Sequence, residues 1–307
     1  MTKVFIDGSA GTTGLRIHER LAARDDLSLI ILPEEVRKDP AARQDALNSA
    51  DIAFLCLPDD AAVEAVSMTS NPGTVIIDTS TAHRTAPGWV YGFPEVGGRY
   101  ALIPSAKRIA NTGCHACGFI SLVAPLVENG LLSPDAELTC FSLTGYSGGG
   151  KKMIAGYESD DRSPLFSAPR QYGLTQKHKH LPEMALVSGL NKAPVFCPVV
   201  APYYAGMEVT VPLHRSQLNG TPADIAACYE AYYRRGLVHF VPAADEAGFL
   251  SASAFEGRDD MQVTVCGNGD RILLISRFDN LGKGASGAAI QNMNLVLGAD
   301  ETAGLNV

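Results

Sequence analysis

Residues 3–24 read KVFIDGSAGTTGLRIHERLAAR, and this stretch decides the fold of the N-terminal half. A short apolar strand, Lys3–Asp7, leads through the glycine-rich loop Gly8–Gly14 into an amphipathic helix, Leu15–Arg24. Glycines permit a tight turn at this point, and the helix start presents N–H groups to a pyrophosphate. The spacing is G-x-x-G-x-x-G rather than G-x-G-x-x-G. The position of the loop between strand and helix, more than the spacing, therefore predicts a dinucleotide site.

The residues that follow alternate between strand-like and helix-like patterns. Continuous apolar strands are predicted at Leu27–Leu32, Asp51–Leu57 and Thr74–Asp78. Helices are predicted to begin at Asp39-Pro40 and at Pro58-Asp59, and the second runs to about Met68. Alternation of strand and helix is typical of a parallel sheet that is covered on both faces. We therefore predict an α/β protein in which residues 1–113 form a Rossmann-type, doubly wound parallel sheet.

The pattern changes after residue 113 and predicts a second domain of a different kind. Helices are expected at Cys114–Asn129, with Gly130 as the stop, and at Pro222–Arg235. Strands are expected at Glu137–Leu143, Val195–Val200, Glu208–Pro212, Val238–Val241, Gln262–Cys266 and Arg271–Phe278. Residues 144–176 look like a long irregular stretch, and such loops usually carry function or form interfaces. The irregular strand spacing predicts an α+β domain over residues 114–282 that includes antiparallel neighbours.

Composition limits the classes of protein to which the chain can belong. Its 307 residues suffice for two domains, and 46% hydrophobic with 19% charged residues is typical of a globular protein. A net charge of -8 argues against a nucleic-acid surface, but it permits a local basic cluster around an anionic substrate. No apolar run approaches the ~20 residues that a membrane helix needs. Because Met1-Thr2-Lys3 leads directly into a strand, we expect neither a secretory signal nor a membrane partner.

The cysteines predict a cytoplasmic protein, and one of them predicts a reactive thiol. The seven lie at positions 56, 114, 117, 140, 197, 228 and 266, mostly inside apolar runs that are typical of reduced, buried thiols. Cys114 differs, because it stands in the run NTGCHACG at 111–118, where Gly113 permits a sharp turn before a helix. The positive end of a helix favours a thiolate at its start. A nucleotide domain followed by such a cysteine suggests thioester chemistry coupled to hydride transfer.

Cys114 and Cys117 also form a C-x-x-C pair, which raises two alternatives. A thioredoxin-like redox site normally follows an early strand, and a zinc site needs a second ligand pair at a suitable spacing, which the chain lacks. We therefore expect no metal. Cys117 is interpreted as a structural residue one helical turn after Cys114, on roughly the same side of the helix.

The run KHKHLPE at 177–183 offers a partner base for the thiolate. A histidine that titrates near neutrality can pair with a thiolate and then protonate a leaving group or an intermediate. Pro182 marks the first turn of a helix. An exposed basic loop is an ordinary alternative, and the candidate thiolate elsewhere in the chain is what favours catalysis. In an extended segment His178 and His180 point to opposite sides, so we expect only one of them to meet the sulfur.

The loop after the fourth strand is a candidate anion site. It reads DTSTAHR at 78–84. Ligands of open α/β sheets bind at the carboxyl ends of strands, so Ser80 and Arg84 are candidates for holding a carboxylate or a phosphate. An ordinary polar loop is the competing interpretation.

A second candidate anion site is the run GYSGGGKK at 145–152. It nearly matches the pattern G-x-x-x-x-G-K-[ST], but Lys152 stands where the magnesium-binding hydroxyl is required, so a nucleoside triphosphatase is not expected. Backbone N–H groups of the loop can still form an anion nest with Lys151 or Lys152 nearby. A flexible glycine loop is the competing interpretation.

Residues after the second strand bear on the choice of cofactor. Glu34 lies where an acidic side chain would bind the ribose of NAD, whereas Arg37 and Lys38 follow it, and basic groups favour the extra phosphate of NADP. Near the C-terminus, residues 279–287 read DNLGKGASG before the last helical pattern, Lys283–Leu297. Small residues there let a backbone or a cofactor approach closely, and a well-packed helix start is the competing interpretation.

Together these runs resemble the shorter form of the N-acetyl-gamma-glutamyl-phosphate reductase family of arginine biosynthesis. The matching runs are GSAGTTG at 8–14, STAHR ending at Arg84, YGFPE at 91–95, NTGCHACG, GYSGGGKK, KHKHLPE, and DNLGKGASGAAIQNMNL at 279–295. They span nearly the whole chain. The wider superfamily includes aspartate-semialdehyde dehydrogenase. The long form typically has Pro in place of Thr112 and HRHTPE in place of HKHLPE, and the change from Arg to Lys keeps the charge but not the fork geometry.

The resemblance implies an activity and a set of site residues. The activity is NADPH-dependent conversion of N-acetyl-L-glutamyl 5-phosphate to N-acetyl-L-glutamate 5-semialdehyde through a thioester on Cys114. His180, or else His178, is implied as the acid/base, and backbone N–H groups at the helix start are implied to stabilise the oxyanion. The residues implied for NADP(H) are Gly8, Ser9, Ala10, Gly11, Thr12, Thr13, Gly14, Arg37, Lys38, Gly284 and Ala285. Those implied for the acyl-phosphate substrate are Ser80, Arg84, Ser147, Lys151 and Lys152.

The resemblance also implies roles for the domains. Residues 1–113 would bind NADP, completed by a C-terminal helix at 283–307, and residues 114–282 would carry catalysis and the contacts of a homodimer or homotetramer. An aspartate-semialdehyde dehydrogenase-like reductase is a rival, and so is a nucleotide-binding regulator without catalysis, although the chain keeps both Cys114 and the histidines. Three points stay open: which histidine acts, whether NADPH is preferred over NADH, and whether the acyl phosphate is free or carrier-bound.

Overall fold

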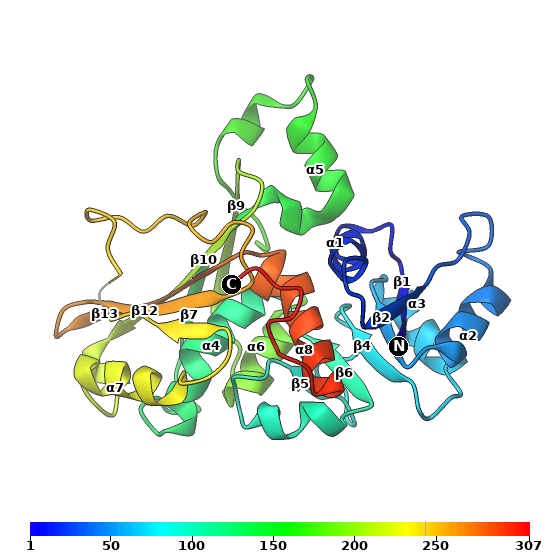
Figure 1. The fold of residues 1–307 in the computed structure, drawn as a ribbon. Coiled ribbons are helices and arrows are strands. Elements are labelled where there is room, and N and C mark those ends of the chain that lie inside the picture. The colour runs from blue at the N-terminus through cyan, green and yellow to red at the C-terminus, as the bar shows by residue number, and fades with distance from the viewer. Residues whose placement is uncertain (243) are drawn as a thin grey trace. The chain divides into compact units, whose positions relative to one another are not determined.

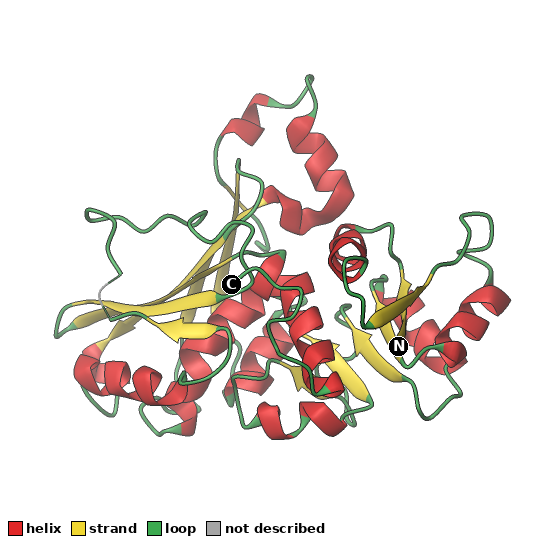
Figure 2. Cartoon of the chain, viewed as in Figure 1, coloured by secondary structure: helices red, strands yellow, loops and turns green. Residues whose placement is uncertain are grey.

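The computed structural model describes residues 1–242 and 244–307, and the chain divides into two compact units. Unit 1 comprises Met1–Phe93, Arg99–Thr112 and Ala285–Leu305. Unit 2 comprises Pro94–Gly98, Gly113–Gly284 and Asn306–Val307. Each unit has its own sheet and its own helices (Figure 2).

Unit 1 is built on a parallel sheet with the strand order β2-β1-β3-β4-β6-β5. The strands are β1 (Thr2–Asp7), β2 (Leu27–Ile30), β3 (Ile52–Leu55), β4 (Val75–Asp78), β5 (Val90–Gly92) and β6 (Arg108–Asn111). The helices are α1 (Thr12–Leu21), α2 (Pro40–Ser49), α3 (Asp59–Met68) and α8 (Gly287–Leu297), with 3-10 turns at Arg99–Ala101 and Ile103–Ser105 (Figure 1).

Apolar side chains on both faces of this sheet explain why helices cover both faces. Val4 and Ile6 of β1 pack with side chains of α1 and α8, whereas Phe5 between them packs with side chains of α2 and α3. Successive side chains of a strand point to opposite faces, so a continuous apolar run requires a helical layer on each face. The prediction of a Rossmann-type, doubly wound parallel sheet is confirmed.

Three features of unit 1 differ from the sequence-based expectation. The strands β5 and β6 were not predicted. α1 begins at Thr12 rather than at residue 15, with Gly11 as its N-cap, so Gly14 lies inside the helix. The C-terminal helix α8 ends at Leu297, as the pattern Lys283–Leu297 predicted, and does not continue to residue 307, because Gly298 ends it in the left-handed conformation. Its predicted start at Lys283 was wrong, since a π-helical turn, Gly282–Ser286, precedes α8.

Unit 2 is built on a mixed sheet with the order β11-β12-β13-β10-β7-β9-β8. Its strands are β7 (Thr139–Gly145), β8 (Arg170–Gln171), β9 (Val195–Ala201), β10 (Met207–His214), β11 (Val238–Phe240), β12 (Met261–Gly267) and β13 (Arg271–Phe278). Its helices are α4 (Cys114–Glu128), α5 (Gly150–Glu158), α6 (Leu181–Ser188) and α7 (Pro222–Tyr232). Both parallel and antiparallel pairs occur, which confirms the expected antiparallel neighbours.

The apolar helix α4 is the centre of unit 2. It contacts β10 and β13 on one side and the helices α6 and α7 on the others. Gly118 allows the close approach to the sheet, because a Cβ there would lie 2.4 Å from a methyl of Val209 and 2.9 Å from the ring of Phe278. The start of α4, where Cys114 lies, is therefore held by the packing of the whole helix.

The stretch 144–176 is ordered, although its sequence looked irregular. It contains 3-10 turns at Tyr146–Gly149 and Pro164–Ser167, the helix α5 and the short strand β8. Stacked rings support it: Tyr157 lies 4.7 Å from Tyr146 on one side and 4.7 Å from Phe166 on the other, measured between centroids. Figure 1 shows α5 standing away from the sheet of its own unit.

Candidate functional site

The glycine-rich loop of unit 1 is shaped by two close backbone contacts. Gly8 has a φ of 86°, and a Cβ there would lie 2.3 Å from the carbonyl oxygen of Cys56. Gly14 packs the first turn of α1 on the loop, because its Cβ would lie 2.4 Å from the carbonyl oxygen of Gly8. Both positions require glycine to bring strand end, loop and helix start together.

A cavity of about 440 Å³ lies beside this loop, within unit 1. Its lining includes Gly8, Ser9, Ala10, Gly11, Leu29, Ile30, Arg37 and Lys38. Thr12, Thr13 and Gly14 instead form the first turn of α1. A dinucleotide fits this arrangement, because the loop backbone and helix start suit a pyrophosphate, the apolar strand suits an adenine, and the two cations suit a 2′-phosphate.

The same cavity is lined by a buried ion pair that the sequence did not reveal. Arg43 of α2 donates from Nε and Nη2 to Oδ2 of Asp7, at 3.1 and 3.0 Å, and from Nη1 to Glu64 of α3 at 3.0 Å. Burial raises the pKa of Asp7 against the opposing pull of Arg43. Because Asp7 directly precedes Gly8, this pair fixes the strand end from which the loop starts.

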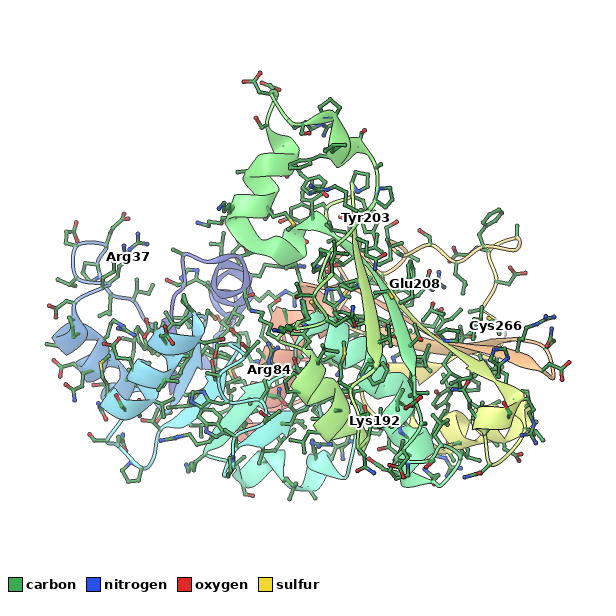
Figure 3. The ribbon with its side chains drawn as sticks, turned by 180° about the vertical axis from the view of Figure 1, so that it is seen from behind. Arg37, Arg84, Lys192, Tyr203, Glu208 and Cys266 are labelled. Atoms are coloured by element: carbon green, nitrogen blue, oxygen red, sulfur yellow. The ribbon has the colours of Figure 1, made fainter. Side chains whose placement is uncertain are left out.

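Arg37, the cation predicted to favour NADP, lies on the segment that follows β2 (Figure 3). Its Nη2 is 2.9 Å from Oε1 of Glu34, and both side chains are largely exposed. The acidic residue that would suit NAD is thus paired with a cation that lines the cavity, and Glu34 itself is not among the described residues of the lining.

Ser80 and Arg84 form hydrogen bonds within unit 1. Ser80 Oγ donates to Oδ2 of Asp78 at 2.7 Å. Arg84, labelled in Figure 3, donates from Nε to the carbonyl oxygen of Asn111 at 3.0 Å and from Nη2 to that of Thr79 at 3.1 Å. Their role in substrate binding stays a prediction, and these contacts hold the loop after β4 against the end of β6.

In unit 2, Cys114 is the first residue of α4. Gly113 is the N-cap with extended backbone, φ -85° and ψ 145°, so the half-buried Cys114 belongs to the first turn of the helix, whose N–H groups have no partner within the helix. The main-chain N–H of Gly113 donates to Oε2 of Glu183 at 3.3 Å. Gly284 approaches from the far end of the unit's sequence, because a Cβ there would lie 2.9 Å from Cβ of Cys114.

His178 and His180 belong to one cluster of rings rather than to opposite sides of an extended segment. Their centroids are 4.8 Å apart, and they lie 5.7 and 5.6 Å from the ring of His115. The predicted opposite orientation was wrong because His180 has helical backbone angles, φ -85° and ψ -11°, as the N-cap of α6. His180 Nε2 lies 4.0 Å from Oε1 of Glu183, and the N–H of His180 donates to Nδ1 of His178 at 3.2 Å.

Sequence reasoning missed two members of this cluster. His115 is the second residue of α4 and is buried. Its Nδ1 lies 2.6 Å from Ser142 Oγ of β7, and its Nε2 lies 2.6 Å from the hydroxyl of Tyr172. Burial raises the pKa of Tyr172, and the nearby Cys114 raises it further, so this phenol keeps its proton at neutral pH. Tyr172 was overlooked because it lies in the stretch that looked irregular.

The glycine run before α5 forms a 3-10 turn, Tyr146–Gly149. Ser147 is buried in the 3-10 turn, and its Oγ accepts a hydrogen bond from Nδ2 of Asn280 at 3.0 Å. Lys151 and Lys152 lie on the first turn of α5 and are exposed. The predicted anion contacts of these three residues stay predictions.

Gly284 and Ala285, both predicted to lie near the cofactor, belong to different units. Gly284 packs beside Cys114 in unit 2. The carbonyl oxygen of Ala285, in unit 1, accepts a hydrogen bond from Nδ2 of Asn111 at 2.9 Å. Lys283 precedes them and is buried, with its carbonyl oxygen 3.7 Å from Cys117 Sγ. Cys117 is buried in α4, in line with its expected structural position.

Across residues 1–242 and 244–307, no group of three or more His, Cys, Asp or Glu side chains is arranged to hold a metal ion. In that same part of the chain, no helix combines the length and the apolarity needed to cross a membrane. All seven cysteines are described, and all are thiols.

Comparisons with known proteins agree with this architecture. Residues 114–280 match the family described as semialdehyde dehydrogenase, dimerisation domain, and residues 31–102 match semialdehyde dehydrogenase, NAD binding domain. Aspartate semialdehyde dehydrogenase II from Vibrio cholerae has a similar fold, with a TM-score of 0.72 and 18% identity over 97% of this chain and 98% of that one.

Proteins with similar sequences indicate a narrower group than the family models do. A protein of Burkholderia lata named N-acetyl-gamma-glutamyl-phosphate reductase is 46% identical over 309 residues, covering 98% of both chains. One of the same name from Rhizobium etli is 47% identical over 305 residues, covering 96% of this chain and 98% of that one. The chain therefore belongs to the semialdehyde dehydrogenase family, on the branch whose members carry the name N-acetyl-gamma-glutamyl-phosphate reductase.

Proposed function

We propose that the protein is an NADPH-dependent reductase that converts N-acetyl-L-glutamyl 5-phosphate into N-acetyl-L-glutamate 5-semialdehyde, a step of arginine biosynthesis. One observation carries the chemistry: a half-buried cysteine begins a long apolar helix with two histidines in the adjoining ring cluster. The names of the relatives supply the substrate class.

In the first step the Cys114 thiolate attacks the acyl carbon of the substrate. The new C–S bond forms while the carbonyl electrons move onto oxygen, and their return expels inorganic phosphate and leaves a thioester. The N–H groups at the start of α4, where Cys114 lies, would stabilise this oxyanion. Cys114 is then released when the reduced intermediate collapses to the aldehyde.

His180 is our candidate for the acid/base, with His178 as the second candidate. Glu183 supports His180, because one of its oxygens lies 4.0 Å from Nε2 of His180 and the other accepts the N–H of Gly113, directly before Cys114. A carboxylate in this position orients an imidazole and stabilises its charged form. The variants His180→Gln and His178→Gln distinguish the two, since loss of the acid/base removes one limb of the pH–rate profile and leaves thiol alkylation intact.

The cavity of unit 1 would hold the cofactor. The pyrophosphate would be contacted by the loop residues Gly8, Ser9, Ala10 and Gly11. The 2′-phosphate of NADP(H) would be bound by Arg37 and Lys38. When bound, the nicotinamide would supply the hydride that reduces the thioester. The first turn of α1, Thr12 to Gly14, would contribute its helix start to the phosphates, and Gly284 and Ala285 remain proposed neighbours of the nicotinamide.

Five residues are proposed to contact the substrate. Ser147, Lys151 and Lys152 would contact the anionic groups of the substrate, since a helix start and two exposed cations favour anions. Ser80 and Arg84 would contribute at the end of β4. Arg84 has hydrogen bonds to two carbonyl oxygens, so we expect Arg84→Lys to disturb the loop as well as substrate binding.

We further propose that the enzyme is cytoplasmic and is a homodimer, or a homotetramer built from two such dimers. On β10, Met207, Val209 and Val211 face α4 and are buried, so Glu208 and Thr210 face the opposite side of the sheet. That side carries the partly exposed apolar side chains Phe141, Val195 and Leu273. Burial raises the pKa of Glu208, which is labelled in Figure 3 near Tyr203. An apolar sheet face of this kind suits a second copy.

The experiment runs the reaction in reverse. Wild-type protein is mixed with N-acetylglutamate 5-semialdehyde, phosphate and NADP⁺, and absorbance of the reduced cofactor is followed, with Cys114→Ala alongside. Phosphate-dependent signal that disappears in the variant supports the proposal. Signal with aspartate semialdehyde alone reassigns the substrate, and silence with both aldehydes from folded protein favours a nucleotide-binding regulator.

A further inference from the structure

The buried imidazole of His115 connects two hydroxyl groups next to the thiol. Its Nδ1 lies 2.6 Å from Ser142 Oγ, and its Nε2 lies 2.6 Å from the hydroxyl of Tyr172. Tyr172 is itself fixed, because its main-chain N–H donates to the carbonyl oxygen of Pro198 at 3.0 Å. Ser142, His115 and Tyr172 therefore form one chain of hydrogen bonds, and it ends at a phenol held by the residue that directly follows Cys114 in α4.

His115 is neutral throughout the physiological range. Burial lowers its pKa to about 3, and the neighbouring His178 contributes in the same direction. The other groups that face its ring are His180, at 5.6 Å between centroids, and the apolar ring of Phe196, at 5.3 Å. A neutral imidazole has one donor nitrogen and one acceptor nitrogen, so one hydroxyl must donate to His115 and the other must accept from it.

The surroundings of Ser142 determine which nitrogen of His115 is the donor. Its side chain is fully buried, and within the described part of the chain His115 is its only hydrogen-bond partner. If His115 donated from Nδ1, the Ser142 O–H would be left buried without an acceptor, which is costly. Ser142 therefore donates to Nδ1, and the proton of His115 lies on Nε2, from which it donates to the oxygen of Tyr172.

The direction of these hydrogen bonds determines whether the Tyr172 hydroxyl can donate to a substrate. The phenol oxygen accepts from His115, so the O–H proton of Tyr172 is directed to another acceptor. Among the residues that the structure describes, His115 is the only hydrogen-bond partner of this hydroxyl. We propose that Tyr172 donates this proton as a hydrogen bond to the acyl oxygen that becomes negative when Cys114 attacks, and that Ser142 and His115 are positioning residues that hold Tyr172 in the donor state. The inference rests on the thioester chemistry proposed above.

The step is balanced without a further reactant. The thiolate electron pair forms the C–S bond, the carbonyl pair moves to oxygen, and the Tyr172 O–H shortens its hydrogen bond to that oxygen without losing the proton. Return of the pair to the carbonyl expels the leaving group. Tyr172 would thus add one donor to the N–H groups of the α4 start, and a single oxyanion donor is worth about 100-fold in rate.

The test uses p-nitrophenyl acetate, an ester that acylates a reactive cysteine and needs neither the cofactor nor the natural substrate. The measurement is the rate of the first burst of p-nitrophenolate per site, with the acetyl group located on Cys114 by peptide mass. We expect Tyr172→Phe to slow this burst about 100-fold. Ser142→Ala should slow it by about 3- to 10-fold, the value of one hydrogen bond, and Ser142→Thr should restore it.

Alkylation of Cys114 by iodoacetamide is the second readout, because that reaction forms no oxyanion. Tyr172→Phe and Ser142→Ala should alkylate at the wild-type rate, which a disturbed helix start would not allow. Ser276→Ala is the matched control for Ser142→Ala: Ser276 is a buried serine of β13 whose Oγ donates to the carbonyl oxygen of Gly118 in α4. Tyr100→Phe is the matched control for the phenol, since Tyr100 donates to Glu301 in unit 1.

A double variant tests whether Ser142 acts through Tyr172. In the Tyr172→Phe background, Ser142→Ala should have no further effect on the burst rate. An equal loss in both backgrounds, a wild-type burst rate in Tyr172→Phe, or parallel losses in acylation and alkylation would each overturn the proposal. Because the ester does not depend on the natural substrate, a normal burst pattern in a protein that reduces no acyl phosphate would reject the proposed function and keep the role of Tyr172.

Discussion

Lys283 and Glu95 form an ion pair inside unit 2, with Nζ of the lysine 2.8 Å from both carboxylate oxygens and neither side chain accessible to solvent. The main-chain N–H of Leu237 donates to the same carboxylate at 2.9 Å. The lysine begins the short segment that brings Gly284 against Cys114. The pair therefore anchors the segment that forms one wall of the thiol site.

Removing one partner of this pair should destabilise the protein strongly. Lys283→Met leaves a buried carboxylate without its cation, which typically costs about 3–5 kcal/mol. The free energy of unfolding, measured in urea, checks this value. Lys192→Met is the matched control, because Lys192 forms an ion pair of similar length, 2.7 Å, with Glu137, and both of those side chains are mostly exposed. It should change stability by less than about 1 kcal/mol.

The double variant Lys283→Met/Glu95→Leu distinguishes the cost of an unpaired buried charge from the effect of the pair on the position of Gly284. Replacing both charges with apolar groups should restore much of the stability. If the pair also positions Gly284, iodoacetamide should still alkylate Cys114 more slowly than in the wild type. Equal losses of stability in Lys283→Met and Lys192→Met would contradict the buried pair.

Gly284→Ala should impair the thiol site more than the fold. The added methyl would lie 2.9 Å from Cβ of Cys114 and 3.2 Å from the carbonyl oxygen of Asp279, so the two segments must separate. We expect kcat to fall about 10-fold or more, because a displacement of about 1 Å at a reacting group can cost up to 100-fold. Gly269→Ala is the control, since no atom lies within 4 Å of its added methyl. Unchanged turnover in Gly284→Ala would mean that this contact does not position Cys114.

Sequence patterns predicted the strands of unit 1 that lie in apolar runs. The predicted strand Thr74–Asp78 and the observed β4, Val75–Asp78, differ by one residue. β5, with the sequence VYG, and β6, with the sequence RIAN, were missed because neither lies in a continuous apolar run, although β3 and β4 are as short as β6. They are strands because β6 pairs with β4 and β5 pairs with β6, a long-range property of the fold.

The candidate site was predictable only where its residues share a short run. Cys114, His178 and His180 stand in such runs, and the structure places both histidines beside the residue that follows the cysteine. Other side chains that support the site are paired with residues from distant parts of the sequence. Glu95 lies 188 residues from Lys283, and Tyr172 lies 57 residues from His115, so no local pattern could join them.

The basic residues of the unit 1 cavity should set cofactor preference. Arg37→Ser and Lys38→Ser each remove a cation that lines the cavity, so each should weaken NADPH binding about tenfold, the value of a hydrogen bond to a charged group. NADH lacks the 2′-phosphate, and its affinity should change little. Fluorescence titration of each reduced cofactor measures both affinities. Lys107→Ser, an exposed lysine of the same unit outside the cavity lining, is the control. Parallel losses for both cofactors would remove Arg37 and Lys38 from phosphate recognition.

Stability should fall steeply in mild acid because of His115. Its pKa drops from the ordinary 6.5 to about 3 on folding, so between these values the unfolded state binds one more proton than the folded state. Stability from this group is fully present above pH 6.5 and is lost as the pH falls toward 3, at up to about 1.4 kcal/mol per pH unit. Urea unfolding at intervals between pH 5 and 7 gives the slope.

His115→Gln removes this titration but keeps an amide that can hydrogen-bond to the neighbouring hydroxyls. The variant should be less stable than wild type at pH 7, and the difference should shrink as the pH is lowered, because only the wild type must release a proton from His115 on folding. His239→Gln, at an exposed histidine of β11, should leave the wild-type slope unchanged. Parallel slopes for wild type and His115→Gln would show that the pKa of this imidazole is not lowered on folding. The donor–acceptor chain from Ser142 to Tyr172 would then be lost below about pH 6.5, because a charged imidazole donates from both nitrogens.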